Sequence, residues 1–331
     1  MRAVAYRASL PVTDPDCFVD IDVPDPTPRP HDLLVRVGAV SVNPADVQMR
    51  ARSKPRGGVG ILGFDAAGVV EAVGSAVTRF RPGDEVFYAG NMRKQGSDAE
   101  FQVVDERIVG HKPVSLSMAD AAALPLTSIT AWESLFGHLR LTRESTGTLV
   151  VVAAAGGVGS MVTQLARQLT GLRVIGTASR PESVRWALEM GAHAVVDHHG
   201  GLAKKVLTEA PDGVDFVFSS RSGPNVNEFA ELLRPFGHVV AIDEAKDLQA
   251  LKLKSITWHW ELMFTRPMLL PADDSQHRLL DEVSRLVDAG RLRTTATTTL
   301  GPLDAQTLRE AHRLVETSRT VGKVVLTGID R

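Results

Sequence analysis

The sequence has little cysteine and no long apolar run. Cys17 is the only cysteine among 331 residues, so an intrachain disulfide is impossible and a metal site built from several thiolates is excluded. No stretch of 18 apolar residues occurs, and the N-terminal residues read as a strand rather than an apolar signal segment. We therefore expect a cytoplasmic protein without a membrane partner.

A strong charge of either sign is also missing. The formal net charge is −2, which gives no electrostatic reason to expect nucleic acid or an anionic membrane as a partner. With 44% hydrophobic and 23% charged residues, the composition is typical of a folded globular protein. The 331 residues are enough for two domains of ordinary size.

Residues 148–169 contain a pattern that organises the rest of the chain. A Val- and Leu-rich stretch runs into Ala-Ala-Ala-Gly-Gly-Val-Gly, residues 153–159, and a helical pattern begins at once. One apolar helix face is formed by Val158, Met161, Val162, Leu165 and Leu169. Gly156 would let the backbone approach a pyrophosphate, and Gly159 would let the helix pack on its strand. The alternative is an ordinary tight turn, since Ala154 replaces the first glycine of the usual G-x-G-x-x-G.

The remaining chain predicts two kinds of architecture. Residues 1–125 read as short strands separated by Gly and Pro, with helices appearing after residue 117. After the glycine turn, strands and helices alternate, which predicts a doubly wound parallel sheet and an α/β fold. Strands are expected at residues 173–176, 194–197, 214–218, 238–242, 254–260 and 322–326. Helices are expected at residues 181–190, 202–209, 226–233, 276–289 and 304–318.

Several short motifs, spread from end to end, together resemble one family. They are VNPAD at 42–46, GFDAAGVV at 63–70, PGDEV at 82–86, ALPLT at 123–127, TAWE at 130–133, the glycine turn and GKVVL at 322–326. The chain resembles the medium-chain dehydrogenase/reductase superfamily, and within it the zinc-free quinone oxidoreductase branch. HWELMF at 259–264 is similar to a subgroup labelled zinc-type alcohol dehydrogenase-like.

This resemblance implies a two-domain protein. A GroES-like, β-rich catalytic domain would comprise residues 1–125 and 266–331, and a Rossmann domain residues 126–265. The active site would lie in the cleft between them. Relatives commonly pair through the edge strand of the Rossmann sheet, so a homodimer through residues 254–260 is expected.

The resemblance also suggests that no metal is bound. Asn43 stands where zinc-dependent relatives have Cys, and Phe64 where they have His, and neither side chain replaces a thiolate or an imidazole as a zinc ligand. Asp46 and Asp65 remain, but two carboxylates without softer partners are expected to be structural.

Three histidines require separate interpretation. His198 and His199 resemble a paired metal-ligand motif, but adjacent loop residues seldom both reach one ion, so solvated loop histidines are expected. His312 falls on the apolar stripe of a predicted helix, where we expect a packed, hydrogen-bonded ring.

The residues after the second Rossmann strand predict the cofactor. NAD-preferring enzymes place a carboxylate there, whereas Ala178 holds that position and is followed by Ser179 and Arg180. A hydroxyl and a guanidinium suit the 2′-phosphate of NADPH, although Arg180 alternatively caps a helix or lies in solvent. The full predicted cofactor set is Ala155, Gly156, Gly157, Val158, Gly159, Ser179, Arg180, Ser219, Ile242 and Lys323, the last approaching the pyrophosphate.

Missing metal ligands also restrict the chemistry. Hydride transfer to a simple carbonyl creates an alkoxide that needs a strong electrophile, whereas a quinone or enone gives a delocalised anion that ordinary donors stabilise. The sequence therefore predicts an NADPH-dependent reductase of quinones or other α,β-unsaturated carbonyls, acting on a small molecule. A carbonyl reductase or alcohol dehydrogenase of the same superfamily, and a weakly active NADPH-binding protein, remain alternatives.

By resemblance, two residues lie near the nicotinamide. Asn43 and Thr127 would orient its carboxamide or donate to the substrate oxygen. Tyr88 would donate a proton or simply pack in the core. The predicted apolar pocket wall, alternatively a dimer-edge segment, consists of Trp260, Met263 and Phe264.

Overall fold

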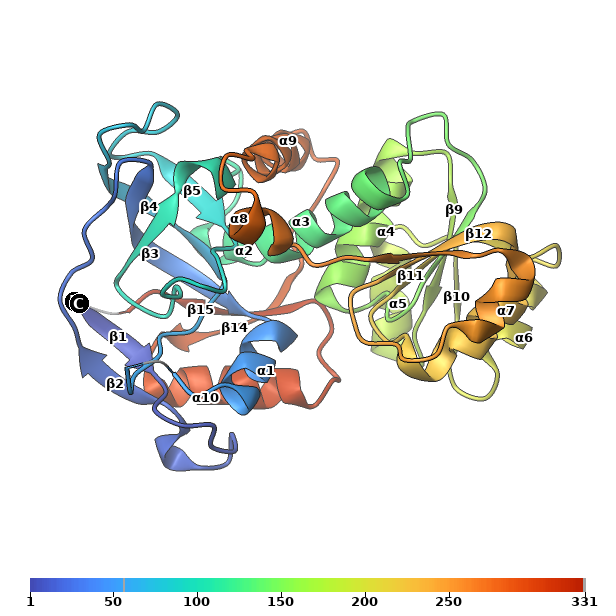
Figure 1. The fold of residues 1–331 in the computed structure, drawn as a ribbon, viewed down its shortest axis with the longest axis horizontal. Helices are drawn as coiled ribbons and strands as arrows, with labels where there is room; N and C mark the ends of the chain where they lie inside the picture. Colours follow the sequence, from blue (N-terminus) through green and yellow to red (C-terminus); the bar gives the residue numbers. More distant parts are fainter. Residues whose placement is uncertain (56, 330–331) are drawn as a thin grey trace. The chain divides into compact units, whose positions relative to one another are not determined.

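The computed structural model describes residues 1–55 and 57–329 and divides into two compact units (Figure 1). Unit 1 comprises Met1–Leu126 and Phe264–Arg331, and unit 2 comprises Thr127–Met263. Within the described residues, no helix combines the length and the apolar character that crossing a bilayer requires.

Unit 2 is built on one parallel sheet of six strands. They are β8 (Thr148–Val151), β9 (Arg173–Thr177), β10 (Ala194–Val196), β11 (Val214–Ser219), β12 (Leu233–Ala241) and β13 (Thr257–Trp260). Their order is β10-β9-β8-β11-β12-β13, and every pair is parallel. This is the strand order of a dinucleotide-binding Rossmann sheet, with its switch point between β8 and β11. The predicted α/β fold class is confirmed.

Helices connect these strands, as alternating apolar stripes predict. They are α4 (Gly157–Leu169), α5 (Pro181–Glu189), α6 (Leu202–Glu209) and α7 (Val226–Leu232), and Figure 1 shows them around the sheet. The entry to unit 2 is helical too: α3 (Pro125–Trp132) continues into a π-helical turn, η3 (Glu133–His138). Val150, Val217 and Phe229 are buried in the core.

Unit 1 is built on a larger mixed sheet. Its main order is β14 (Ala296–Pro302), β15 (Lys323–Thr327), β3 (Asp32–Val42), β4 (Asp65–Val73), β5 (Glu85–Tyr88) and β7 (Val109–His111), and β6 (Phe101–Asp105) pairs with β3. A second sheet pairs β1 (Arg2–Ala5) with β2 (Val19–Asp22). The helices are α1 (Pro44–Arg52), α2 (Met118–Ala122), α8 (Thr265–Leu269), α9 (Ser275–Asp288) and α10 (Ala305–Glu316). The strand β15 joins the C-terminal segment to β3, far earlier in the chain.

Three elements differ from the sequence-based expectation. The helix α1 lies in a region expected to be strands and loops, although Asn43 before Pro44 with Asp46 at the third helical position is a helix-start signal. The strand β14 was not expected. Residues 254–260 were expected to form one strand, but a 3-10 helix (Gln249–Lys254) occupies the start, and β13 begins only at Thr257.

Candidate active site

The glycine turn of unit 2 follows β8 directly and has little room for side chains. Ala153 has a positive φ of 59°, and its N–H donates to Thr177 Oγ1 at 3.0 Å. A Cβ on Gly159 would lie 2.4 Å from the Ala153 carbonyl oxygen, so only glycine fits there. A Cβ on Gly156 would lie 3.5 Å from the same oxygen, an ordinary contact. The turn therefore presents bare backbone at Gly156 while Gly159 seats the helix against the strand.

The N-terminus of α4 is suited to an anion. Gly156 is its N-cap and provides no side-chain cap, and the Ser160 N–H closes the first turn on the Gly156 carbonyl at 2.8 Å. The first N–H groups of a helix have no acceptor inside it, and the helix dipole makes this end positive. The backbone donors of Gly157, Val158 and Gly159 are thus the groups that a diphosphate would use.

The other predicted cofactor residues of unit 2 follow the carboxyl ends of the parallel strands. Ser219 pairs with Ala241, and the N–H of Ile242 donates to the Ser219 carbonyl at 3.1 Å. Ser179 is exposed just beyond β9. The Arg180 guanidinium lies 3.0 Å from the Glu182 carboxylate, so a phosphate at Arg180 would share that cation with Glu182.

Unit 1 contains a buried polar network centred on Asp65, the first residue of β4. Its Oδ2 accepts hydrogen bonds from Ser41 Oγ and Asn43 Nδ2, each at 2.9 Å, and from Lys323 Nζ at 3.0 Å. Its Oδ1 accepts from the Leu126 N–H at 2.7 Å. Asp65 is completely buried, and Asn43 and Lys323 are 2% and 4% exposed. This carboxylate therefore ties four distant chain segments together.

The amide of Asn43 is fully engaged in this network. Its Oδ1 accepts from Lys323 Nζ, and its Nδ2 donates to Asp65 and, at 3.4 Å, to the Ser41 carbonyl. Lys323 Nζ also donates to the Val42 carbonyl at 3.1 Å. The predicted contact of Lys323 with a pyrophosphate and the predicted substrate contact of Asn43 stay predictions, and both would have to compete with these bonds.

A second buried carboxyl, Asp46, holds the start of α1. Its Oδ2 accepts the Asn43 N–H at 2.8 Å, while its Oδ1 has no partner among the described residues. Burial raises the pKa of Asp46 to about 7. Burial, with a smaller contribution from the charge of Asp46, also raises the pKa of Asp98. Asn43 is therefore fixed by hydrogen bonds of its side chain to Asp65 and Lys323 and of its backbone N–H to Asp46.

The remaining predicted residues belong to different surroundings. Tyr88 is fully buried in the unit 1 core, its hydroxyl has no partner among the described residues, and burial raises its pKa. Thr127 is buried in the first turn of α3. Trp260 is half exposed and packs edge-on against Trp258. Met263 is buried at the end of unit 2.

Phe264 and His312 both lie in unit 1. The ring of Phe264 packs against Phe64, with centroids 4.6 Å apart. His312 is fully buried and contacts Phe18 edge-on, but within the described part of the chain neither ring nitrogen has a hydrogen-bond partner. The expectation of a hydrogen-bonded His312 is therefore wrong. The apolar neighbours offer no acceptor, and burial lowers its pKa to about 3.

Comparisons with known proteins identify the family. The model described as "Alcohol dehydrogenase GroES-like domain" matches residues 29–129, and that described as "Zinc-binding dehydrogenase" matches residues 190–326. A zinc-type alcohol dehydrogenase-like protein of Staphylococcus epidermidis is 37% identical, covering 98% of this chain and 99% of the relative. A quinone oxidoreductase of Pseudomonas aeruginosa is 33% identical, covering 90% and 92%.

The chain belongs to the medium-chain dehydrogenase/reductase superfamily. It is an oxidoreductase of that superfamily. A crystal structure of a Rhizobium etli protein, provisionally assigned as a zinc-dependent alcohol dehydrogenase, has a TM-score of 0.96 and 48% identity, covering 100% of this chain and 99% of that one. A quinone oxidoreductase structure from Pseudomonas syringae has a TM-score of 0.84 and 27% identity, covering 98% and 99%.

The names of several superfamily relatives raise the question of zinc, and the donor set in unit 1 does not suit that metal. The lone pairs of Asp65 and Asn43 are engaged by Lys323, whose ammonium would repel a second cation in the same place. Phe64 offers only a ring, and Cys17 is buried with its thiol 3.9 Å from the Val12 carbonyl. Zinc sites need thiolate, imidazole or available carboxylate ligands.

Among the residues that the structure describes, one group of side chains in this superfamily member has ligand-like spacing. The ligand atoms of Asp197, His198 and His199, after β10, lie within 4.8 Å of one another. His199 Nδ1 lies 2.9 Å from Asp197 Oδ1, and Lys205 Nζ lies 3.4 Å from the other carboxylate oxygen. The neighbouring lysine charge opposes a cation, and the interpretation as loop histidines stays a prediction.

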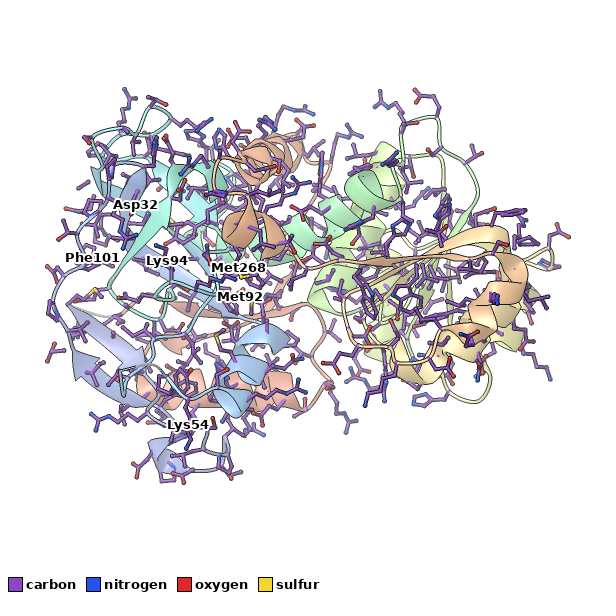
Figure 2. All side chains as sticks on the ribbon, viewed as in Figure 1. Asp32, Lys54, Met92, Lys94, Phe101 and Met268 are labelled. Carbon is purple, nitrogen blue, oxygen red and sulfur yellow. The ribbon has the colours of Figure 1, made fainter. Side chains whose placement is uncertain are left out.

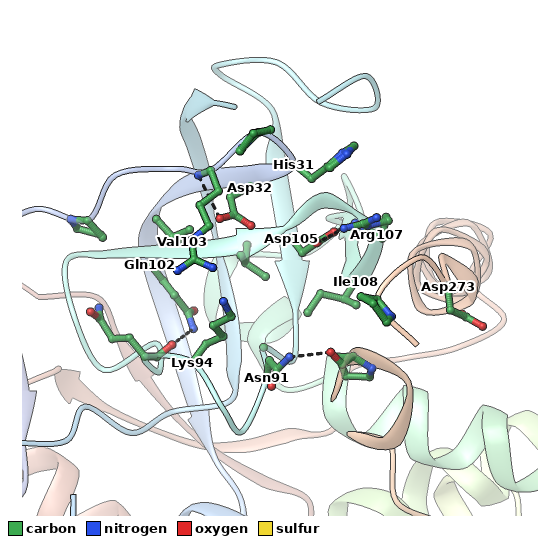
Figure 3. Close-up of a pocket in the computed structure, with 18 of the residues that line it drawn as sticks. His31, Asp32, Asn91, Lys94, Gln102, Val103, Asp105, Arg107, Ile108 and Asp273 are labelled. Carbon is green, nitrogen blue, oxygen red and sulfur yellow. Dashed lines mark hydrogen bonds and ion pairs between the residues drawn. The ribbon is translucent and has the colours of Figure 1, made fainter. Parts of the chain in front are cut away.

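A cavity of about 500 Å³ lies elsewhere in unit 1. Asp32 and Lys94, labelled in Figure 2, line it from two different segments. Figure 3 shows Arg107 paired with Asp105, and Asn91 donating to the Pro267 carbonyl at 2.9 Å. None of the predicted catalytic residues lines this cavity.

Sequence reasoning missed Ser41 and the convergence on Asp65. Ser41 lies near the end of β3, and Asn43 follows that strand as the N-cap of α1. Sequence reasoning also missed a histidine cluster in unit 2, formed by His138 of η3, His238 of β12 and His259 of β13. His138 Nε2 lies 2.7 Å from Glu261 Oε2, and His238 Nδ1 lies 3.3 Å from His259 Nε2.

Proposed function

We propose that the protein is an NADPH-dependent reductase that transfers hydride to a quinone or another α,β-unsaturated carbonyl without a metal. The observation that carries the proposal is the saturated network around Asp65. Both carboxylate oxygens of Asp65 and the amide oxygen of Asn43 are already engaged by Ser41, Asn43, Lys323 or the Leu126 N–H. A substrate whose reduced form delocalises its negative charge needs no such metal.

Unit 2 supports the choice of a nicotinamide dinucleotide. The donors at the start of α4 suit a diphosphate, and the strand order matches the dinucleotide-binding sheet. Ala178 is buried where a ribose-binding carboxylate would stand, followed by exposed Ser179 and by Arg180. Without a repelling carboxylate, a 2′-phosphate is favoured there, which supports NADPH over NADH.

Bound NADPH would supply the hydride to the substrate. The residues of this chain bind and orient: backbone N–H groups at Gly157 and Val158 hold the diphosphate, and Arg180 holds the 2′-phosphate. Asn43 and Thr127 shape the nicotinamide side, while the proton comes from solvent, because the Tyr88 hydroxyl is buried in the unit 1 core. We also propose a homodimer through β13, because this edge strand ends in the half-exposed Trp260.

A small substrate panel tests the proposal. Naphthoquinone, an enone and an aldehyde are each offered with NADPH and with NADH, and nicotinamide oxidation is followed at 340 nm. Turnover of the quinone or enone with NADPH is expected. Turnover of the aldehyde alone would support the carbonyl reductase alternative. Tight NADPH binding without turnover of any of the three would support a non-catalytic role.

A further inference from the structure

Lys323 is the cation at the centre of the Asp65 network. It is the first residue of β15. Its side chain reaches Val42 at the end of β3, Asn43 at the N-cap of α1 and Asp65 at the start of β4. Asp65 in turn accepts the backbone N–H of Leu126, which immediately precedes Thr127 in α3. One ion pair thus links both residues predicted to lie at the nicotinamide.

All three protons of the Lys323 ammonium are used, and both oxygens of Asp65 accept hydrogen bonds. An ammonium has three protons, and Lys323 Nζ has three acceptors: the Val42 carbonyl, Asn43 Oδ1 and Asp65 Oδ2. The carboxylate of Asp65 receives four donors. Both side chains are buried, so removing either partner leaves an unpaired charge away from water. Such a network tolerates only one arrangement of its members.

We propose that Lys323 is a positioning residue of the reductase. Its ammonium fixes the rotamer of the Asn43 amide directly and, through Asp65, fixes the first turn of α3 that carries Thr127. This inference rests on the proposed function, because the positions of Asn43 and Thr127 affect a measurable rate only if the protein catalyses hydride transfer. This positioning role replaces the pyrophosphate contact expected for Lys323. The three ammonium protons are already donated to buried acceptors, so a hydrogen bond to a phosphate would leave one of those acceptors without its donor.

Lys112 provides a matched control in the same unit. Its side chain is 3% exposed, and its Nζ donates to the carbonyls of Pro113 at 2.8 Å and Leu116 at 2.5 Å and pairs with Glu85 at 3.2 Å. Lys323→Met and Lys112→Met thus remove the same group from similarly buried, triply bonded positions. Only the first touches Asn43 and Asp65.

The two variants are compared in steady-state kinetics and in NADPH fluorescence titration. Lys323→Met is expected to lower kcat by about 100-fold, the effect of a small misplacement of orienting groups, with the NADPH Kd within twofold of wild type. Lys112→Met is expected to change neither. An NADPH Kd raised tenfold or more with kcat unchanged would overturn the proposal in favour of the pyrophosphate contact. Unchanged kcat and unchanged Kd would overturn it outright.

A readout without turnover separates this inference from the proposed function. Backbone hydrogen exchange of segments 41–46 and 123–127 should accelerate in Lys323→Met and not in Lys112→Met. If Lys323→Met fails to fold, Lys323→Met combined with Asp65→Asn removes both charges and should fold, still with faster exchange and low kcat. If hydrogen exchange of these segments in the Lys323 variants is as slow as in the wild type, the positioning role is contradicted. A wild-type protein inactive on the whole panel would contradict the function alone.

Discussion

The two regions that carry the predicted site, the N-terminus of α4 and the Asp65 network, differ in how their polar groups are hydrogen-bonded. At the start of α4 in unit 2, backbone donors are left for a ligand, and no side chain in the described part of the chain caps the helix. Around Asp65 in unit 1, every donor and acceptor of the ion pair is satisfied by the protein itself. The first arrangement suits a group that arrives and leaves, and the second suits groups that must not move. A reductase that relies on its cofactor for chemistry needs both.

The largest expected effect comes from breaking the fixed region. Asp65→Asn leaves the Lys323 ammonium buried without its carboxylate, which should lower the free energy of unfolding by about 3–5 kcal/mol. Urea unfolding monitored by far-ultraviolet circular dichroism measures this change. The control is Asp274→Asn, because Asp274 makes surface ion pairs with Arg79 and Arg278 and should change stability by less than about 1 kcal/mol. Equal effects of the two substitutions would show that the network is no more constrained than a surface pair.

Adding a side chain to the glycine turn should disrupt the other region, the N-terminus of α4. Gly159→Ala places a Cβ 2.4 Å from the Ala153 carbonyl oxygen, so it should destabilise unit 2 by about 3 kcal/mol and abolish NADPH binding. Gly156→Ala meets only an ordinary contact at 3.5 Å and should fold normally. Weaker NADPH binding by folded Gly156→Ala would place the diphosphate at this turn. An unchanged NADPH affinity in Gly159→Ala would contradict the claim that only glycine fits at this position.

Buried ionisable groups predict a pH dependence of stability. The folded pKa of His312, about 3, lies below its ordinary 6.5, so the unfolded chain binds more protons and stability falls as pH drops below 6.5. Between pH 7 and 5 this amounts to about 2 kcal/mol. Asp46 acts oppositely: its folded pKa of about 7 lies above 3.8, so its contribution falls as pH rises from 4 to 7.

These two contributions are separated by substitution. His312→Phe should reduce the loss of stability between pH 7 and 5, and Asp46→Asn should enlarge it, as measured by urea midpoints at both pH values. The same pH slope in His312→Phe and in the wild type would mean that His312 is solvated or paired in the folded protein. The pH dependence of these two variants therefore tests whether buried polar groups of unit 1 outside the Asp65 network are also shielded from water.

The smallest expected effect concerns cofactor choice in unit 2. Arg180→Ala should lower the ratio of kcat/KM for NADPH to that for NADH by about tenfold, the loss of one charge-assisted contact to phosphate. Glu182→Ala removes the competing carboxylate 3.0 Å from Arg180 and should raise the same ratio. An unchanged ratio in Arg180→Ala would place the 2′-phosphate elsewhere.

Patterns confined to one segment were readable from the sequence. The run from β8 through the glycine turn into α4 has a strand period, a turn and a helix period in order, and the α/β class followed from it. The helix α1 has a start signal in Asn43-Pro44-Ala45-Asp46, but the interpretation of residues 1–125 as short strands did not use it. The late start of β13 was not readable, because the 3-10 helix before it has no strong period of its own.

The Asp65 network shows what a sequence alone does not contain. Asn43, Asp65, Leu126 and Lys323 are separated by up to 280 residues. The sequence predicts a nicotinamide contact for Asn43, a structural role for Asp65 and a pyrophosphate contact for Lys323, and it indicates no contact among them. Only the pairing of β15 with β3 and of β3 with β4 brings them together. Local periodicity predicts elements, whereas the neighbours of a buried charge depend on sheet order. His312 was misread for the same reason, since its neighbour Phe18 comes from the other end of the chain.

The central claim, reduction by NADPH with organic groups alone, is tested most directly by measuring metal content and turnover together. Untagged protein is dialysed against a strong zinc chelator, its zinc is quantified by elemental analysis, and quinone reduction by NADPH is assayed before and after. We predict unchanged turnover with far less than one zinc per chain. Near-stoichiometric zinc before dialysis, with turnover lost on its removal and restored on its return, would contradict the account.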